Sequence, residues 1–389
     1  MKRHSANSFL SSLLLIVALL GGGEVRLFAQ AEKPKPLFNT YFPKPTGKNG
    51  YEDWVRAADM LSLHDDWGRL FGELNAPLSK VRSALREPDA RTIIDLIRLG
   101  AEKPILFLHD PTKIDFSTNF PEYARLRDLA RMLNNAIYVS LAEGKNYEAI
   151  DLLRAGLIMG NKIQQEALIG GLVGIAVEAL VLARFRDTLP TLSVRDCDEL
   201  ERLALVMTNA PSPLPNLIAQ EKVGVINSLK SIKSAKDIEG VFTSDEPDEP
   251  NELAKEIERH LKANPSAIET LMQNVFKEMD RKFEVIITNA NLLPWQRTPL
   301  HNASNTLAGK IADELTPVWE TVFKRYDERR GNLQMLGLRA ALRRYWWQNG
   351  QFPKTLEALN VGDRILEPKT GKPFSYSLKE NGYDLLATK

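Results

Sequence analysis

One carboxylate stands out as a candidate for chemistry. Glu178 lies in the segment 167–183, where every other residue is apolar or glycine. Gly174 lies four residues before it and Leu182 four after, so a helix would offer it no local basic partner. A carboxyl group buried without a partner has a raised pKa and is a candidate for acid–base catalysis. The alternative is a structural glutamate that meets a distant arginine or reaches solvent at a helix edge.

Glu221 could supply a second carboxyl group. It lies one turn into a helix expected from Asn216 onward, after the proline-rich connector 211–215. A carboxylate-dependent hydrolase uses one such group as the acid and another as the base. Glu178 and Glu221 therefore form a catalytic hypothesis, although the sequence alone does not place them within reach of each other.

Common catalytic and metal-binding motifs are absent from the sequence. It contains no G-x-S-x-G, no P-loop pattern, no H-E-x-x-H and no G-x-G-x-x-G. His64 and His109 are the only histidines followed by an acid, and both are expected on the surface. Cys197 is the only cysteine, which excludes an intramolecular disulfide and a cysteine-based metal site. The acidic segment 244–252 does not match EF-hand spacing. No metal and no cofactor are predicted.

Three consecutive aromatic residues, Tyr345, Trp346 and Trp347, are the candidate binding residues. At 100° per residue, Tyr345 shares one helix face with Leu338 and Leu342, and Trp346 lies beside that face. Trp347 lies on the opposite face, with Leu336, Ala340 and Arg343. The helix therefore has two apolar faces. Either both are buried, between a helical body and the C-terminal strands, or one is a docking patch.

The N-terminus has the pattern of a secretory signal peptide over residues 1–31. Lys2, Arg3 and His4 precede an apolar run from Phe9 to Leu20, and Ala29-Gln30-Ala31 is a cleavage site. We expect an exported protein, periplasmic or secreted; an uncleaved anchor is the alternative. Cleavage would leave 48 basic and 49 acidic residues of the original 51 and 50. A net charge near −1 argues against nucleic acid as a partner.

The rest of the chain divides into a flexible lead-in (32–50), an α-helical domain (51–330) and a tail (331–389). Residues 122–160 predict a helical hairpin that turns at 143–146. It resembles one tetratricopeptide unit, but no second copy follows in register, so an ordinary hairpin is favoured. The apolar segment 167–183 is expected to be a core helix rather than a membrane span, because it is short and carries Glu178.

The tail carries the most specific pattern in the chain. A long helix, with a possible break near Gly331, ends before Gly350, and a short alternating strand closes the chain. Between them lie Phe352-Pro353, Pro368, Thr370-Gly371, Pro373-Phe374, Tyr376 and Gly382-Tyr383. This order resembles the C-terminal part of the major pseudopilins of type II secretion. The resemblance implies a turn at Pro-x-Thr-Gly and a helix packed on a small sheet. It also implies a calcium site, which is not carried over because acids are sparse here.

Together these features predict a mainly α-helical protein with a small α+β, pseudopilin-like tail. A pilus subunit is disfavoured, because prepilins are cut before their apolar helix and this chain offers its cut after it. The first functional hypothesis is a non-catalytic binding or structural protein of the cell envelope or secretion apparatus, with a protein partner and no stable membrane span. The second is a carboxylate-dependent periplasmic hydrolase.

Overall fold

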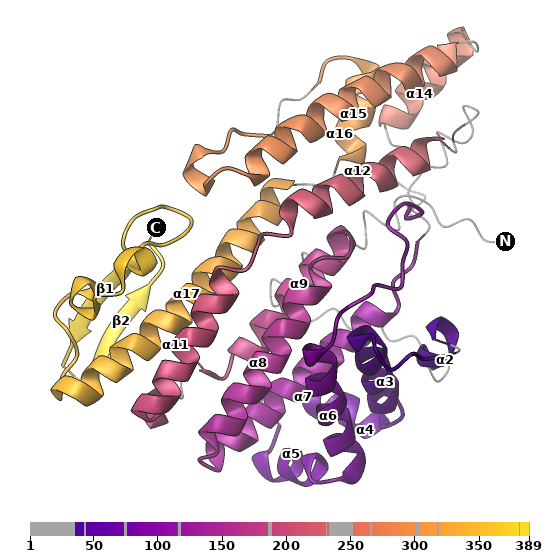
Figure 1. Cartoon of the computed structure of the whole chain (residues 1–389). Coiled ribbons are helices and arrows are strands. Elements are labelled where there is room, and N and C mark those ends of the chain that lie inside the picture. The colour runs from indigo at the N-terminus through magenta and orange to yellow at the C-terminus, as the bar shows by residue number, and fades with distance from the viewer. Residues whose placement is uncertain are drawn as a thin grey trace.

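A computed structural model of the chain describes residues 36–42, 44–73, 76–115, 118–185, 189–230, 232, 252–264, 267–300, 304–316, 319–380 and 382–388. Within these ranges the protein is mainly helical, with one small antiparallel sheet near the C-terminus, as predicted for the fold class (Figure 1). The signal peptide and residues 244–251 of the acidic segment lie outside the described residues.

The N-terminal helices pack around one long helix. They are α2 (Phe38–Tyr41), α3 (Gly50–Ser62), α4 (Asp65–Gly72), α5 (Leu78–Leu85) and α6 (Pro88–Glu102), beside α7 (Glu122–Ala142). Asp59 of α3 accepts hydrogen bonds from the backbone N–H groups of Leu37 and Phe38 and pairs with Arg125 of α7. The described part of the lead-in is therefore anchored to the helical body.

The hairpin predicted for residues 122–160 is present. Helix α7 turns through Gly144, whose φ of +70° suits glycine, into α8 (Asn146–Ile163). Helix α9 (Ala167–Leu182) packs on both. A Cβ atom on Gly174 of α9 would lie 2.3 Å from the carbonyl oxygen of Gly160 of α8, so the two backbones meet with no room for side chains.

Helix α9 is buried along most of its length, as expected for a core helix. In the part of the chain that the structure describes, no helix combines the length and the apolar character required to cross a bilayer.

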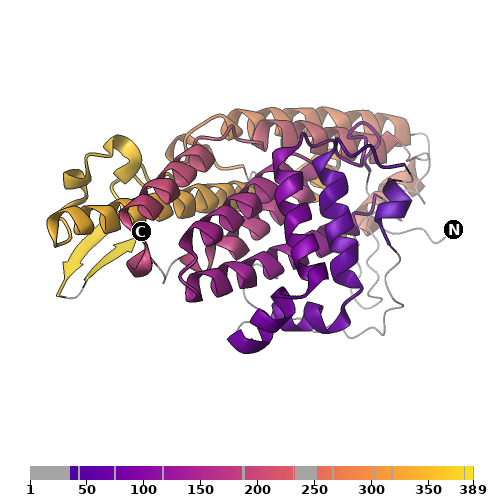
Figure 2. The ribbon, with the colours of Figure 1, turned by 60° about the horizontal axis from the view of Figure 1, so that its bottom comes forward.

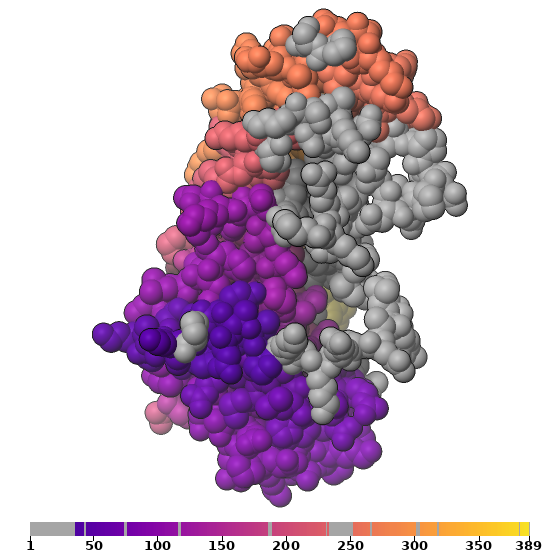
Figure 3. Space-filling view, turned by 90° about the vertical axis from the view of Figure 1, so that its right-hand side faces the viewer, coloured from indigo at the N-terminus to yellow at the C-terminus, as the bar shows by residue number. Residues whose placement is uncertain are grey.

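A second group of helices forms the other end of the body. After the short helix η1 (Leu189–Thr191) come α11 (Val194–Thr208), α12 (Leu214–Lys230), α14 (Glu252–Ala263), α15 (Ile268–Ala290), η3 (Pro294–Gln296) and α16 (Leu307–Leu315). Helix α11 begins with a capping box, in which Ser193 and Asp196 bond each other's backbone N–H. Figure 3 shows α14 and α15 at one end of the molecule and the N-terminal helices at the other.

Helix α17 (Trp319–Asn349) links all parts of the molecule and continues through Gly331 without the break considered above. Its first two turns pack in the core formed with α12, α15 and α16, through Trp319 and Phe323. Further along, Leu336 and Ala340 join the core of the N-terminal helices and α11. Leu338 and Leu342, on another face, pack in the core of the tail. Both apolar faces predicted for this helix are therefore buried in hydrophobic cores.

The tail contains two strands that form a small sheet. Short helices η4 (Leu356–Leu359) and η5 (Gly362–Ile365) lead into a turn closed by hydrogen bonds from Thr370 and Gly371 to Glu367. Strands β1 (Ser375–Lys379) and β2 (Gly382–Leu386) then form an antiparallel hairpin, in which Ser375 lies opposite Leu386. Figure 2 shows the hairpin at one end of the molecule, with β2 on the side nearer the body.

Candidate functional site

The structure places Glu178 in a buried ion pair. Arg329 of α17 donates hydrogen bonds to both carboxylate oxygens, Nε to Oε2 at 2.6 Å and Nη2 to Oε1 at 2.9 Å. Gln164 Nε2 adds a third, at 2.7 Å from Oε1. Burial raises the pKa of Glu178, while Arg329 and Gln164 oppose the rise. The carboxylate therefore meets a distant arginine, which was the structural alternative to a catalytic role.

Glu221 lies apart from this pair. Its residue is 8% exposed, and no hydrogen bond or ion pair to it is present among the described residues. Burial alone raises the pKa of Glu221 to about 7, with no contribution from Glu178. Neither carboxyl group lines any of the pockets described below. The structure does not bring Glu178 and Glu221 together.

A different set of ionisable side chains converges inside the N-terminal part. Tyr51 of α3 and Tyr123 of α7 both donate their hydroxyl groups to Glu166 Oε2, at 3.3 and 2.9 Å. His109 lies in the loop between α6 and α7, and its Nε2 is 2.9 Å from Glu122 Oε1. Its backbone N–H donates to Glu166 Oε1 at 3.4 Å. We call these five residues the buried acidic cluster.

The electrostatics of this cluster follow from its burial. Burial raises the pKa of Glu166 to about 7, although the hydrogen bond from Tyr123 opposes the rise. Burial lowers the pKa of His109, but the hydrogen bond and the charge of Glu122 outweigh this effect and raise it overall. Tyr51 and Tyr123 have pKa values well above the ordinary one, chiefly because of burial.

Backbone strain lies directly beside Glu166. Ala167 has φ +45°, a left-handed conformation that is uncommon for a residue with a side chain. Its N–H donates to Gln220 Oε1 of α12 at 2.8 Å, which fixes the start of α9. The strained residue thus lies next to Glu166, whose carboxylate accepts from the two tyrosines.

Sequence reasoning missed the cluster because its members come from four separate segments. His109 was compared with Asp110, its neighbour in sequence, but Asp110 bonds Thr112 and Lys113 instead. His109 is also largely buried, with its side chain 14% exposed, rather than on the surface. Within the described ranges, no three histidine, cysteine or acidic side chains are arranged to hold a metal ion. The cluster is a set of hydrogen-bonded ionisable groups, of which Tyr51, Glu122, Tyr123 and Glu166 are buried.

A concave surface that carries one of the predicted binding residues lies between the tail and the body. We call it the aromatic groove; its cavity volume is about 620 Å³. Helix α17 contributes Arg339, Arg343 and Trp346, the tail contributes Phe352 and all of β2, and Leu189 and Pro190 close it. The Phe352 and Tyr383 rings stand edge to face with centroids 4.9 Å apart. The groove therefore combines aromatic surface with two guanidinium groups.

The three predicted binding residues have different positions. Trp346 lines the groove, with the Arg343 guanidinium carbon 4.2 Å from its ring centroid. Tyr345 packs against the core of the tail. Trp347 is 48% exposed and donates from Nε1 to the carbonyl of Leu192, at 2.9 Å, on the side of the body. Of the three, Trp346 is the one that lines the aromatic groove.

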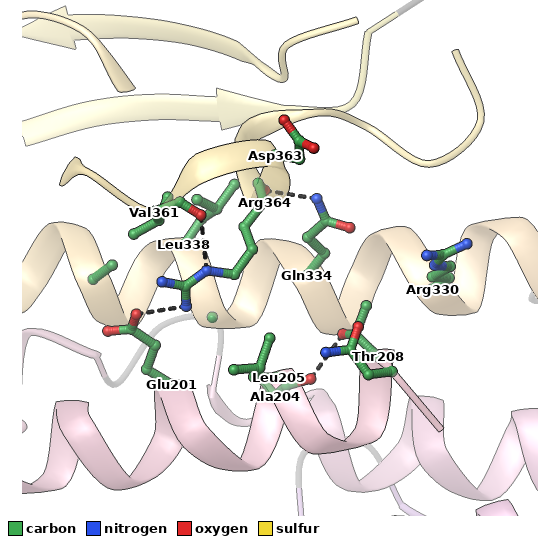
Figure 4. A pocket seen from close by; sticks show the side chains of 13 residues that line it. Glu201, Ala204, Leu205, Thr208, Arg330, Gln334, Leu338, Val361, Asp363 and Arg364 are labelled. Atoms are coloured by element: carbon green, nitrogen blue, oxygen red, sulfur yellow. Dashed lines mark hydrogen bonds and ion pairs between the residues drawn. The ribbon is translucent and has the colours of Figure 1, made fainter. Parts of the chain in front are cut away.

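A smaller pocket lies between α11, α17 and η5, and the side chains that line it bond one another across the cavity (Figure 4). Arg364 Nη1 donates to Glu201 Oε1 at 2.7 Å, and Arg344 pairs with the other oxygen of Glu201 at 2.9 Å. Gln334 Nε2 donates to the carbonyls of Arg364 and Leu366, each at 2.6 Å. The cavity of about 200 Å³ is smaller than most ligand pockets, so it serves to hold the tail in place.

Comparisons of the chain with protein-family models, with curated proteins and with solved structures found no match.

Proposed function

We propose that this protein is an exported, non-catalytic binding protein of the bacterial envelope or secretion apparatus. The aromatic groove is its docking site for a protein partner. The observation that carries the proposal is the meeting of Trp346, Tyr383 and Arg343 in one concave surface. Tryptophan, tyrosine and arginine are the residues that dominate binding energy at protein interfaces. The volume of the groove also falls in the usual range for binding sites.

The hydrolase alternative has less support. It needs two carboxyl groups that converge on a substrate in a cavity. Glu178 is neutralised by Arg329, and Glu221 lies apart from it. The buried acidic cluster has carboxyl groups, but it lines neither the aromatic groove nor the pocket of Figure 4.

The export and envelope part of the proposal rests on the sequence. The basic, apolar and small-residue pattern of residues 1–31 supports export. Leu338 and Leu342 of α17 pack with Leu385 of β2, and a turn lies at residues 367–371, which supports the proposal that the tail is a pseudopilin-like module. The tail lies at the end of the long helix α17 (Figure 1).

A photo-crosslinking experiment tests the docking site. Leu386, 60% exposed at the groove, is replaced by a benzoylphenylalanine residue in the full chain, which is irradiated in envelope extract of the source bacterium. We expect one dominant crosslinked protein, and Trp346→Ala should reduce its yield about tenfold. The matched control places the same probe at Leu63, which is 73% exposed in the N-terminal part. An identical product from both positions, or one insensitive to Trp346→Ala, would overturn the proposal.

A further inference from the structure

A pocket in the N-terminal part of the protein gathers basic side chains from several helices. It lies where α5, α6, the end of α7 and the start of α8 meet, and its cavity volume of about 460 Å³ is within the usual range of ligand sites. We call it the basic pocket. None of its residues lines the aromatic groove, so the two sites are separate. Its basic members come from α5, α6 and the turns that follow α5 and α7, and are Arg82, Arg86, Arg91, Arg98 and Lys145.

Two of these arginines have no close acidic partner. Glu143 is already shared by Arg82, whose Nε lies 2.9 Å from it, and by Lys145, whose Nζ lies 2.8 Å from it. Arg86 approaches Glu143 only to 3.9 Å. The side chain of Arg91 makes no hydrogen bond or ion pair among the described residues. Both guanidinium groups are therefore available to a ligand.

The remaining charges leave the pocket positive. Arg98 pairs with Asp95 at 3.7 Å and with Asp151, outside the pocket, at 2.9 Å. Glu148 is exposed, and it forms no ion pair in the part of the chain that the structure describes. Five basic side chains thus face three carboxylates in the pocket, and four when Asp151 is included. The excess positive charge favours a negatively charged ligand.

A buried hydroxyl group points to a ligand independently of these charges. Ser140 of α7 lines the basic pocket and is only 5% exposed. Its hydroxyl group has no hydrogen-bond partner among the described residues, not even the carbonyl four residues before it, which serine in a helix often uses. A buried polar group without a partner is costly. An acceptor oxygen in the pocket would remove this cost.

Two further donors in the pocket lack a hydrogen bond. The Nε atoms of Arg82 and Arg98 are buried, and each lies 2.9 Å from a carboxylate oxygen without forming a hydrogen bond to it. These N–H groups are therefore poorly aligned with the carboxylates of the protein. The pocket contains more donors than its own acceptors satisfy.

The placement of the donors favours phosphate over carboxylate. Arg86 follows α5, Arg91 belongs to α6 and Ser140 to α7, so the donors reach the pocket from three elements rather than from one side. A phosphate group offers three strong acceptor oxygens in tetrahedral directions, whereas a carboxylate offers two in one plane. Guanidinium groups also pair with phosphate through two parallel hydrogen bonds.

We propose that the basic pocket binds a phosphate group, carried by a small soluble compound or by a lipid headgroup. Arg86 and Arg91 pair with the phosphate oxygens, and Ser140 donates its hydroxyl group to one of them. Arg82 and Lys145 stay on Glu143 and add positive charge. This site is additional to the aromatic groove, and it stands or falls independently of the docking function proposed above.

Calorimetric titration of the full chain with inorganic pyrophosphate at low salt tests the site. Arg91→Gln should weaken binding about tenfold, and Ser140→Ala about threefold. Ser140→Ala should not impair folding, because it removes a hydroxyl group that has no partner. Glu148→Gln should tighten binding about twofold, because it removes an opposing charge. The matched control, Arg56→Gln, replaces an exposed arginine of α3 outside the pocket and should leave the affinity unchanged.

Vesicles distinguish the two sources of the phosphate group. Sedimentation with vesicles that contain phosphatidic acid, but not with vesicles of phosphatidylcholine alone, would identify a lipid headgroup if Arg91→Gln abolishes it. Binding of pyrophosphate that depends on Arg91 identifies a soluble compound. The proposal is overturned if neither probe binds, or if Arg91→Gln and Arg56→Gln have equal effects. Citrate bound as tightly as pyrophosphate would also overturn it, because the pocket would then select negative charge rather than phosphate.

Discussion

Arg329 and Glu178, 151 residues apart in sequence, form a two-pronged ion pair in the centre of the molecule. The pair joins the last helix of the body, α17, to its most apolar helix, α9, and both side chains are almost fully buried. A charge in such a place is tolerated only when a partner and hydrogen bonds compensate it. The pair and Gln164 thus fix how α17 crosses α9.

Breaking this pair should destabilise the fold strongly. Glu178→Leu leaves a buried arginine, and Arg329→Met leaves a buried carboxylate, so each should lower the free energy of unfolding by about 3–5 kcal/mol. The double variant Glu178→Leu/Arg329→Met should lower the free energy of unfolding by less than the sum of the two single losses, because it leaves no unpaired charge. Urea denaturation measures all three. Strictly additive losses would contradict the pairing.

Glu166 should make stability depend on pH near neutrality. Its pKa in the folded protein is about 7, above the ordinary 4.5, so the folded state binds more protons between these values. The stabilisation is complete below about pH 4.5 and is lost as pH rises through about 7. A shift of this size corresponds to at most about 3 kcal/mol. Glu166→Gln should flatten this decline in urea unfolding between about pH 5 and pH 8; an unchanged slope would exclude the effect.

Glu221 should act in the same direction and independently. Burial alone raises the pKa of Glu221 to about 7, so its contribution is also lost as pH rises through that value. We expect Glu221→Gln to reduce the loss of unfolding free energy between about pH 5 and pH 8 by an amount similar to that of Glu166→Gln. The double variant Glu166→Gln/Glu221→Gln should remove the contributions of both carboxyl groups. The two effects should add within about 0.5 kcal/mol, because neither carboxyl group contributes to the pKa shift of the other and no hydrogen bond joins them within the described ranges. Strong non-additivity in the unfolding data would show that they are coupled.

Two glycines should respond oppositely to the same substitution. Gly174→Ala places a Cβ 2.3 Å from the Gly160 carbonyl oxygen and 2.9 Å from the Gln164 nitrogen, so α8 and α9 must separate. We expect a loss of about 2 kcal/mol or more. Gly68→Ala, inside α4, meets nothing within 4 Å and should stabilise by about 0.5–1 kcal/mol. Thermal unfolding measures the stability of both variants. Equal effects would contradict the close crossing of α8 and α9 at Gly174.

Arg364 should hold the tail against α11. Arg364→Leu removes the bond to Glu201 and should speed amide exchange across residues 350–388 by about tenfold, with little change in α7 and α8. The matched control, Arg330→Leu, removes an exposed arginine at the mouth of the same pocket. Equal effects of the two variants would show that the ion pair does not fasten the tail.

The helical elements could be predicted because their signals are local. The spacing of apolar residues indicated the hairpin of α7 and α8, and Gly144 marked its turn. The apolar sequence of α9, interrupted by Glu178 alone, indicated a core helix. The positions of Leu342 and Ala340 indicated that α17 has two apolar faces, and both are buried. These patterns arise because burial repeats with the period of the helix.

The candidate sites could not be predicted in the same way. The sequence pointed to Glu178 as an unusual carboxylate and to Trp346 as a binding residue. Only the tertiary structure paired Glu178 with Arg329, placed Trp346 beside β2, and brought Glu166 to Tyr51 and His109. Such contacts join segments that are far apart in the sequence. They depend on how whole helices pack, which no local period of the sequence encodes.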